Sequence, residues 1–234
     1  MARLPRIALP GIPQHVVQRG NNRLPCFLDD RDRLRYLQLL RDALHRSGCA
    51  LHAYVLMDNH VHLLLTPPTV QATGRLMQRL GRHYVALFNG RHGRTGTLWE
   101  GRYKACLIDS EDHLLRCYRY IELNPVRAAI TDDPARYRWS SCLANLGLRP
   151  HSALQPHPSF LALGSDTATR ANAYRALLDA ALTPEDLAAI RATLQQQRAL
   201  GTSAFQAMVQ AKTQRFAGVR PAHRPRKSAA TGDK

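Results

Sequence analysis

Acidic residues are scarce in this chain. Its 234 residues include 17 aspartates and glutamates against 33 lysines and arginines, which gives a formal net charge of +16 at pH 7. Such an excess indicates a polyanionic partner, because the summed field of the protein attracts negative charge. Nucleic acid is the leading class of partner, and an anionic membrane surface is the second.

The chain also lacks a long uninterrupted hydrophobic run. Its longest apolar stretch, residues 50–65, is broken by three histidines, an aspartate and an asparagine. A helix that spans a bilayer needs about 20 consecutive apolar residues, so we expect no membrane span. The opening sequence MARLPRIALPGIP is interrupted by prolines and has no apolar core. We therefore expect no secretory signal peptide.

Paired cysteines are absent as well. The cysteines are odd in number and form no C-x-x-C motif, which argues against both a disulfide framework and a cysteine-rich zinc site. Reduced thiols are typical of the cytoplasm, where we expect this protein. The residues concerned are Cys26, Cys49, Cys106, Cys117 and Cys142.

Hydrophobic periodicity predicts an α+β fold. Strand-like and helical patterns alternate in the order βαββαβ. This order is typical of a ferredoxin-like sandwich, an antiparallel sheet with helices on one face. A further helix is expected to begin at the capping residue Ser110, with Glu111 and Asp112 in its first turn, and to run to Pro125. The expected strands are 15–18, 50–57, 60–65 and 103–108, and the expected helices before residue 110 are 30–46 and 71–88.

We divide the chain into a domain of residues 1–148, a helical extension of residues 149–215 and a basic tail of residues 216–234. The extension is rich in alanine and poor in strand formers. The tail, FAGVRPAHRPRKSAATGDK, is expected to be disordered without a ligand. Together with the helix expected at 202–215 it grips duplex or hairpin backbone, or else it serves solubility. The helices expected in the extension are 167–182, 184–200 and 202–215.

The stretch MDNHVHLLL places His60 and His62 two residues apart in a predicted strand. Alternate side chains of a strand share a face, so both imidazoles point the same way. A pair of this kind can hold a metal ion. The spacing is equally compatible with two histidines that only pack and form ordinary hydrogen bonds.

The helix HLLRCYRYIELNP carries two tyrosines on different faces. Tyr118 shares a face with apolar residues, whereas Tyr120 lies about 200° away from it. The i, i+4 relation puts the Asn124 amide alongside the Tyr120 phenol. Proline at the next position disfavours helical geometry at Asn124. The plainer alternative makes Asn124 a helix-terminating residue and Tyr120 a surface aromatic.

Together these residues suggest a catalytic site. Two imidazoles and one amide oxygen would leave coordination positions open on Mg²⁺ or Mn²⁺. Phosphate oxygens would fill those positions and complete the coordination shell. Such an ion polarises a phosphodiester. A tyrosine phenol ordinarily has a pKa of about 10 and needs a neighbouring cation to act as a nucleophile at neutral pH. The metal, with Arg116 or Arg127, is the expected source of that charge.

The sequence resembles the single-tyrosine HUH transposases, and within them the transposases associated with repetitive extragenic palindromes (REPs). Four blocks carry the resemblance in the family's order: VVQRGNNR, NHVHLLL, LWEGRYKACLID and RYIELNPVRAAI. It extends over residues 10–145. It implies that His60 and His62 are the metal-binding pair, Tyr120 the nucleophile and Asn124 the third ligand. Asp58 departs from the proline of many relatives, which puts the turn geometry in question.

The resemblance also implies an activity. A bacterial, nucleoid-associated enzyme of this kind binds single-stranded DNA beside a hairpin and cuts it with Mg²⁺ or Mn²⁺. The tyrosine keeps a 5′-phosphotyrosine link that a second 3′-OH later resolves. No nucleotide cofactor is required, because the covalent link stores the energy of the broken bond. The protein is expected to be a monomer or a homodimer.

Basic and aromatic residues near these motifs are candidates for DNA contact. Guanidinium groups suit phosphates and base edges, and aromatic rings stack on unpaired bases. The alternative for the glycine-rich segment after residue 88 is an ordinary solvated basic loop. The candidates are Arg19, Arg91, Arg94, Trp99, Arg102, Tyr103, Lys104, Arg116 and Arg127.

Two other functions remain compatible with the sequence. One is a hairpin-binding protein derived from a transposase that no longer catalyses. The other is a metal-dependent hydrolase in which water replaces the tyrosine. A trapped covalent protein–DNA adduct would distinguish the transferase from both.

Overall fold

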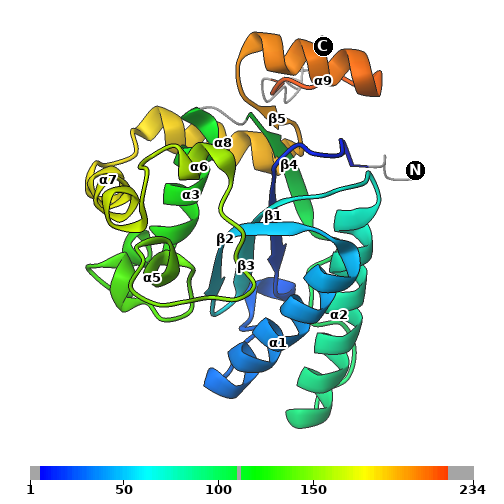
Figure 1. Ribbon diagram of the computed structural model, residues 1–234. Helices are drawn as coiled ribbons and strands as arrows, with labels where there is room; N and C mark the ends of the chain where they lie inside the picture. Colours follow the sequence, from blue (N-terminus) through cyan, green and yellow to red (C-terminus); the bar gives the residue numbers. More distant parts are fainter. Residues whose placement is uncertain (1–5, 110–111, 221–234) are drawn as a thin grey trace, which may run out of the picture.

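The computed structural model describes residues 6–109 and 112–220, and its centre is a mixed five-stranded sheet (Figure 1). The strand order is β2-β3-β1-β4-β5. No helix in the described ranges is long and apolar enough to cross a membrane. The strands are β1 (Gln14–Arg19), β2 (Ala50–Met57), β3 (His60–Thr66), β4 (Lys104–Ile108) and β5 (Ala199–Leu200).

The first four strands and two long helices have the predicted βαββαβ order. β1 pairs antiparallel with both β3 and β4, and β2 pairs antiparallel with β3. α1 (Asp30–Ser47) joins β1 to β2, and α2 (Ala72–Arg91) joins β3 to β4. The α+β, ferredoxin-like prediction is therefore confirmed.

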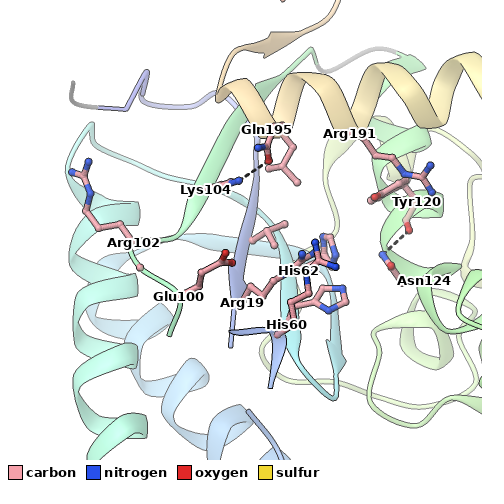
Figure 2. Close-up of a pocket in the computed structure, with 14 residues that line it drawn as sticks. Arg19, His60, His62, Glu100, Arg102, Lys104, Tyr120, Asn124, Arg191 and Gln195 are labelled. Atoms are coloured by element: carbon pink, nitrogen blue, oxygen red, sulfur yellow. Dashed lines mark hydrogen bonds between the residues drawn. The ribbon is translucent and has the colours of Figure 1, made fainter. Parts of the chain in front are cut away.

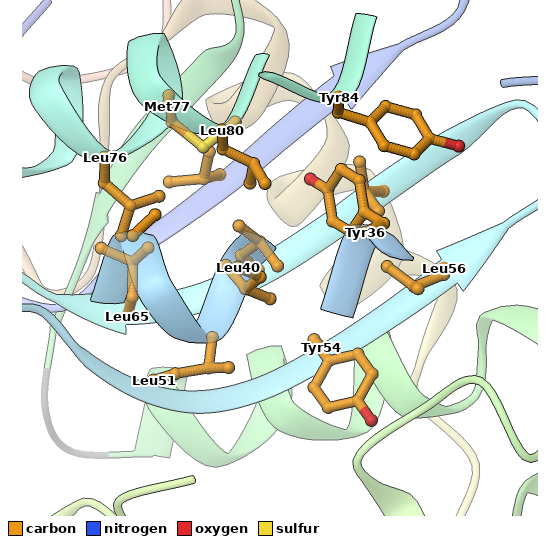
Figure 3. Packing of buried hydrophobic residues seen from close by; sticks show 14 of the residues in the cluster. Tyr36, Leu40, Leu51, Tyr54, Leu56, Leu65, Leu76, Met77, Leu80 and Tyr84 are labelled. Atoms are coloured by element: carbon orange, nitrogen blue, oxygen red, sulfur yellow. The ribbon is translucent and has the colours of Figure 1, made fainter. Parts of the chain in front are cut away.

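α1 and α2 pack together on one face of the sheet (Figure 3). The rings of Tyr36 on α1 and Tyr84 on α2 meet edge to face, with 5.0 Å between their centroids. Leu40 and Leu80 lie in the same core, above Tyr54 of β2. Burying each large apolar side chain contributes about 1.5–3 kcal/mol, so this layer fixes the strands that carry the histidines.

The opposite face is covered by helices that follow β4. Side chains alternate along each strand, so Val16 enters the core under α1 and α2, whereas Val17 enters the second core. Tyr118 and Ile121 of α3 fill that second core. Its helices and the adjoining short elements are α3 (Asp112–Glu122), α4 (Asn124–Arg127), α5 (Cys142–Asn145), α6 (Pro158–Leu161), α7 (Thr167–Asp179) and α8 (Pro184–Gln196), with the 3₁₀ turn η2 (Pro134–Arg136). Another 3₁₀ turn, η1 (Asn21–Arg23), follows β1.

The helix predicted to run to Pro125 is divided in two. α3 ends at Glu122, and Asn124 opens the short helix α4, with Pro125 in its first turn. Proline is favoured at the start of a helix because its missing N–H would have no partner there. Asn124 therefore begins a helix instead of ending one. The predicted cap at Ser110 and its neighbour Glu111 lie outside the described residues.

The turn between β2 and β3 accommodates Asp58 without a proline. The Asp58 carboxylate forms an ion pair with Arg33 of α1. Its backbone carbonyl accepts hydrogen bonds from the amides of Cys26 and Phe27, at 2.8 and 3.2 Å. The turn that precedes His60 is thus held by side-chain and backbone contacts.

The extension differs from its prediction at one point. The helix expected over 184–200 ends at Gln196, and Gln197 adopts a left-handed conformation with φ 54°. Ala199 and Leu200 form β5, which pairs parallel with β4 and makes the sheet mixed. Pairing with the sheet edge thus outweighs the helical tendency of an alanine-rich segment. α9 (Ser203–Thr213) follows, capped by Thr202.

The first residues assigned to the tail belong to this folded layer. Ala217 is fully buried, and its carbonyl accepts a hydrogen bond from the Ala199 amide at 2.9 Å. Arg198 and Arg220 both lie near the Phe216 ring. The rest of the expected tail, 221–234, lies outside the described residues. All five cysteines are buried and unbridged.

Candidate active site

The described residues line a cavity of about 700 Å³ beside strands β1, β3 and β4 (Figure 2). Its walls come from β1, β3 and β4, from the loop before β4, and from helices α3, α4 and α8. It is lined by Val17, Arg19, Arg23, His60, His62, Glu100, Gly101, Arg102, Lys104, Tyr120, Asn124, Arg191, Leu194 and Gln195.

His60 and His62 lie on the same face of β3, as the strand periodicity requires. Their ring centroids are 5.0 Å apart, with the planes at 75°. His62 is 4% exposed, and His60 is half-buried at the strand's start. The pair thus points into the cavity from a strand paired on both sides.

A neighbouring residue engages the Nδ1 atom of each histidine. His60 Nδ1 donates to the Asn59 side-chain oxygen at 2.6 Å, and His62 Nδ1 lies 2.7 Å from His15 Nε2. His15 is fully buried on β1. An imidazole whose Nδ1 donates keeps the Nε2 lone pair for a ligand, the usual arrangement around metal-binding histidines; His60 has this form, and His62 has it in the tautomer that donates to His15.

Burial keeps these imidazoles neutral at pH 7. It lowers the pKa of His60 to about 4, with a further contribution from the Arg19 guanidinium. It lowers the pKa of His15 to about 3, and that of His62 well below its usual value. A neutral imidazole is the form that binds a metal ion.

Tyr120 reaches the cavity from the next layer. Its ring centroid is 5.9 Å from that of His62 and 5.7 Å from that of His15, both edge to face. The Arg127 guanidinium carbon lies 4.3 Å from the centre of the same ring. Tyr118, by contrast, is fully buried and stacks on another ring. The predicted division of the two tyrosines between helix faces is confirmed.

Asn124 lines the cavity, but its hydrogen bond differs from the expected one. Its Nδ2 donates to the backbone carbonyl of Tyr120 at 3.1 Å, not to the phenol. The amide oxygen remains for a ligand. Two imidazole nitrogens and one amide oxygen fit Mg²⁺ or Mn²⁺ that takes further oxygens from substrate or water. The described ranges contain no cluster of three or more His, Cys, Asp or Glu side chains placed to hold a metal ion.

The cavity wall is strongly cationic. Arg19 and Arg102 line it, and Lys104 donates from Nζ to the Gln195 side-chain oxygen at 2.5 Å. Glu100 is the single carboxylate among the described lining residues. A concave surface with this balance of charge attracts an anion.

Other predicted DNA contacts lie elsewhere. Arg91 pairs with the carboxylates of Asp29 and Asp32, which neutralises it. Arg116 pairs with Asp186 of α8 at 3.0 Å. Arg94 is half-buried beside a phenylalanine ring and does not line the cavity.

The two aromatic candidates do not match their predicted role. Trp99 is 7% exposed and packs near the Tyr84 ring, so its faces are not open to a base. Tyr103 lies under the Arg6 guanidinium, 3.6 Å from the ring centre. Both belong to the layer under α2 because the loop before β4 folds back on the sheet.

A buried carboxylate lies two residues after Tyr120. Glu122 is fully buried and accepts hydrogen bonds from Asn145 Nδ2 and the Tyr174 hydroxyl, both at 2.7 Å, and from the Ser141 hydroxyl. Burial raises the pKa of Glu122 to about 7, against the opposing effect of these donors. The contacts tie α3 to α5 and α7.

Several lining residues, and His15 behind His62, were not singled out from the sequence. Arg23 and Glu100 lie inside blocks used for the resemblance, where a search for further polar residues would have found them. His15 is part of a short apolar strand. Arg191 and Gln195 come from α8, and no sequence pattern connects that helix to the histidines.

Comparison with known proteins places this site in a family. The model of IS200-like transposases matches residues 9–124, a span from just before β1 to Asn124. No curated protein matches the chain. Among solved structures, the chain is similar to a REP-associated tyrosine transposase bound to a REP hairpin, with 16% identity and a TM-score of 0.51, over 67% of this chain and 99% of that chain.

A putative transposase from Deinococcus radiodurans R1 is similar at 22% identity, over 55% of this chain and 92% of that chain, with a TM-score of 0.36. The likeness to the hairpin-bound protein is one of fold, and the family match rests on sequence. Residues 9–124 of this chain belong to the family of IS200-like transposases.

Proposed function

We propose that this protein is a metal-dependent single-stranded DNA endonuclease and strand transferase of the REP-associated branch. The observation that carries the proposal is the meeting of Tyr120 with His60 and His62 at one cation-lined cavity. These residues come from adjacent layers of the fold, the sheet and the helices that cover it, and general packing gives no reason for a phenol and two neutral imidazoles to share a polar cavity.

The proposed reaction begins at Tyr120. Its phenolic oxygen attacks the scissile phosphorus, a bond from that oxygen to phosphorus forms, and the bond from phosphorus to the 3′ oxygen breaks. The phenol proton passes to solvent and the leaving 3′ oxygen gains a proton. The Arg127 guanidinium carbon lies 4.3 Å from the centre of the reacting ring.

His60, His62 and Asn124 are the proposed metal ligands. Bound there, Mg²⁺ or Mn²⁺ would polarise the phosphodiester. Contacts within the chain orient both rings: His60 Nδ1 donates to the Asn59 side-chain oxygen, which leaves its Nε2 lone pair free, and His62 offers Nε2 in the tautomer whose Nδ1 donates to His15. No nucleotide cofactor is needed, because the phosphotyrosine link conserves the energy of the bond.

Single-stranded DNA beside a hairpin is the proposed substrate. The solved structure of similar fold is bound to a REP hairpin, and the cavity of this chain offers Arg19, Arg102 and Lys104 to phosphates. Such contacts position a backbone without reading its sequence. A bacterial, nucleoid-associated protein that acts as a monomer or a homodimer fits this role.

A hairpin-binding protein without turnover is the second candidate. The observation that favours it is the 7% exposure of Tyr120, which leaves little of the ring open to an incoming strand. Arg127 and α8 both lie close to this tyrosine. In this case the cavity would bind DNA and the tyrosine would stay unreacted.

One experiment separates the candidates. The full chain is incubated with single-stranded oligonucleotides that carry the hairpins flanking its own gene, with Mg²⁺, with Mn²⁺ or with chelator. A denaturing gel then resolves cleaved strands from covalent adducts. Adducts that need a divalent ion support the transferase. Cleavage without an adduct indicates a hydrolase, and binding without cleavage indicates the silent protein.

A further inference from the structure

α8 forms one wall of the cavity, although it lies outside the residues that match the transposase family. Arg191 and Gln195 of this helix line the cavity across from the histidine pair (Figure 2), and Leu194 lines it as well. The C-terminal extension is therefore part of the site and not a separate appendage.

Three contacts fix the position of α8. Near its start, Asp186 pairs with Arg116 of α3 at 3.0 Å. In its middle, Ile190 is buried in the core beneath α3. Near its end, the Gln195 side chain accepts a hydrogen bond from Lys104 of β4 at 2.5 Å. The helix is thus held near both of its ends, and its cavity-facing side chains have defined positions.

Arg191 lies one turn before Gln195 on the same helix face and is itself exposed. Arg191 and Tyr120 both line the cavity, and the Arg127 guanidinium carbon lies 4.3 Å from the centre of the Tyr120 ring. The charge of Arg191 also lowers the pKa of Arg127, although burial is the larger cause. Within residues 6–109 and 112–220, neither guanidinium forms an ion pair with a carboxylate. Two neighbouring cations without a counter-ion repel each other, and an anion between them relieves that repulsion.

We propose that Arg191 and Arg127 together bind the phosphate that Tyr120 attacks. This inference rests on the proposed function and extends it to a helix that the family match does not include. The non-bridging oxygens of a phosphodiester suit two guanidinium groups. The same phosphate stays attached to Tyr120 after the 3′ oxygen leaves, so the two arginines would hold both the substrate and the phosphotyrosine product.

The test measures binding in a chain that cannot form the adduct. In the Tyr120→Phe background, the affinity for a hairpin oligonucleotide with a single-stranded flank is measured by fluorescence anisotropy. Each flank phosphate is replaced in turn by a neutral methylphosphonate. Arg191→Ala is compared with the parent chain and with Lys212→Ala, which removes one exposed charge from α9 outside the cavity lining.

Arg191→Ala is expected to weaken binding about fivefold to tenfold and to reduce the salt dependence by about one phosphate contact. At one linkage of the flank, replacing the phosphate by methylphosphonate should weaken DNA binding by the parent chain but not DNA binding by Arg191→Ala. Lys212→Ala should retain the parent's loss at that linkage.

The proposal would be overturned if methylphosphonate reduced the affinity of the parent chain and of Arg191→Ala equally at every linkage. It would also be overturned if the parent chain did not bind DNA at all. If the effect of methylphosphonate at one linkage depends on Arg191 while the chain with Tyr120 forms no adduct, the phosphate site stands and only the proposed turnover fails. An unchanged melting temperature in Arg191→Ala excludes misfolding as the cause.

Discussion

Tyr118 and Tyr120 have opposite surroundings although one residue separates them. The Tyr118 ring stacks on Phe160 with 5.2 Å between centroids, and its hydroxyl accepts from the His157 amide at 3.4 Å. Tyr120 instead lines the cavity beside Arg127. At the scale of single residues, the Tyr118 ring is enclosed by other rings, whereas the Tyr120 ring, 7% exposed, borders the cavity.

The first prediction tests this division. Tyr120→Phe removes only the phenolic oxygen at the cavity, so the variant should fold and bind hairpin DNA but form no covalent adduct. Tyr118→Phe should keep the adduct and lose about 1 kcal/mol of stability with one hydrogen bond. Mass spectrometry of the trapped complex should locate the nucleotide on Tyr120. An adduct on Tyr118 would overturn the site.

The second prediction concerns the histidine pair. His60→Ala and His62→Ala should each abolish cleavage, because the remaining ligands would hold a hard ion too weakly to polarise the phosphate. Hairpin affinity should change little, since the arginine and lysine side chains of the wall are intact. Electrophoretic mobility shifts and cleavage assays measure the two effects separately.

Two outcomes would count against this role of the histidines. Loss of folding in either variant, seen by circular dichroism, would favour a packing role. Full cleavage by the unaltered protein in chelator would exclude the metal from the reaction.

At the scale of elements, α3 is held by polar contacts in its middle and at its C-terminal end. Arg116 joins it to α8, and Glu122 joins it to α5 and α7 through Asn145 and Tyr174. A buried carboxylate is costly when ionised, even with three donors around it. Stability should therefore depend on the protonation of Glu122.

The third prediction follows from the raised pKa of Glu122. Burial raises it from 4.5 to about 7, so the folded protein holds this proton more tightly than the unfolded chain does. The resulting stabilisation is complete below pH 4.5 and is lost as the pH rises to about 7. Glu122→Gln carries no such proton. Relative to this variant, the unaltered protein should lose up to about 3 kcal/mol of unfolding free energy across that range.

Chemical denaturation at several pH values measures this difference. Glu185→Gln, a substitution of an exposed glutamate on α8, is the matched control and should leave the pH dependence of the unaltered protein in place. If the unfolding free energies of the unaltered protein and Glu122→Gln changed in parallel with pH, Glu122 would not take up a proton on folding in this range.

At the scale of the whole molecule, the net charge of +16 dominates. Cations line the cavity with one carboxylate among them. A chain that contacts several phosphates releases condensed counter-ions from the DNA, and this release makes binding depend on salt.

The fourth prediction is a steep fall in hairpin affinity between about 50 and 200 mM salt. Removing residues 221–234 should flatten this dependence, because that segment carries Arg224, Arg226, Lys227 and Lys234 against Asp233. The truncation keeps residues 216–220, which pack on β5. Anisotropy titrations over a salt series give the slope, and an identical slope in the truncated chain would show that this segment does not touch DNA.

The sequence by itself determined the local pattern of the fold and part of the site. Strand periodicity put His60 and His62 on one face, and helical phase separated Tyr118 from Tyr120, because both depend only on the geometry of a single element. The order βαββαβ followed from the same local signals.

Only the tertiary structure decided which distant groups meet. It brought His15 to His62, Glu122 to Tyr174 and α8 to the cavity, and it turned residues 199–200 into a strand on the edge of β4. It also buried Trp99, which by residue type alone suits base stacking equally well. These outcomes depend on the packing of layers far apart in the chain, and no short-range spacing encodes that packing.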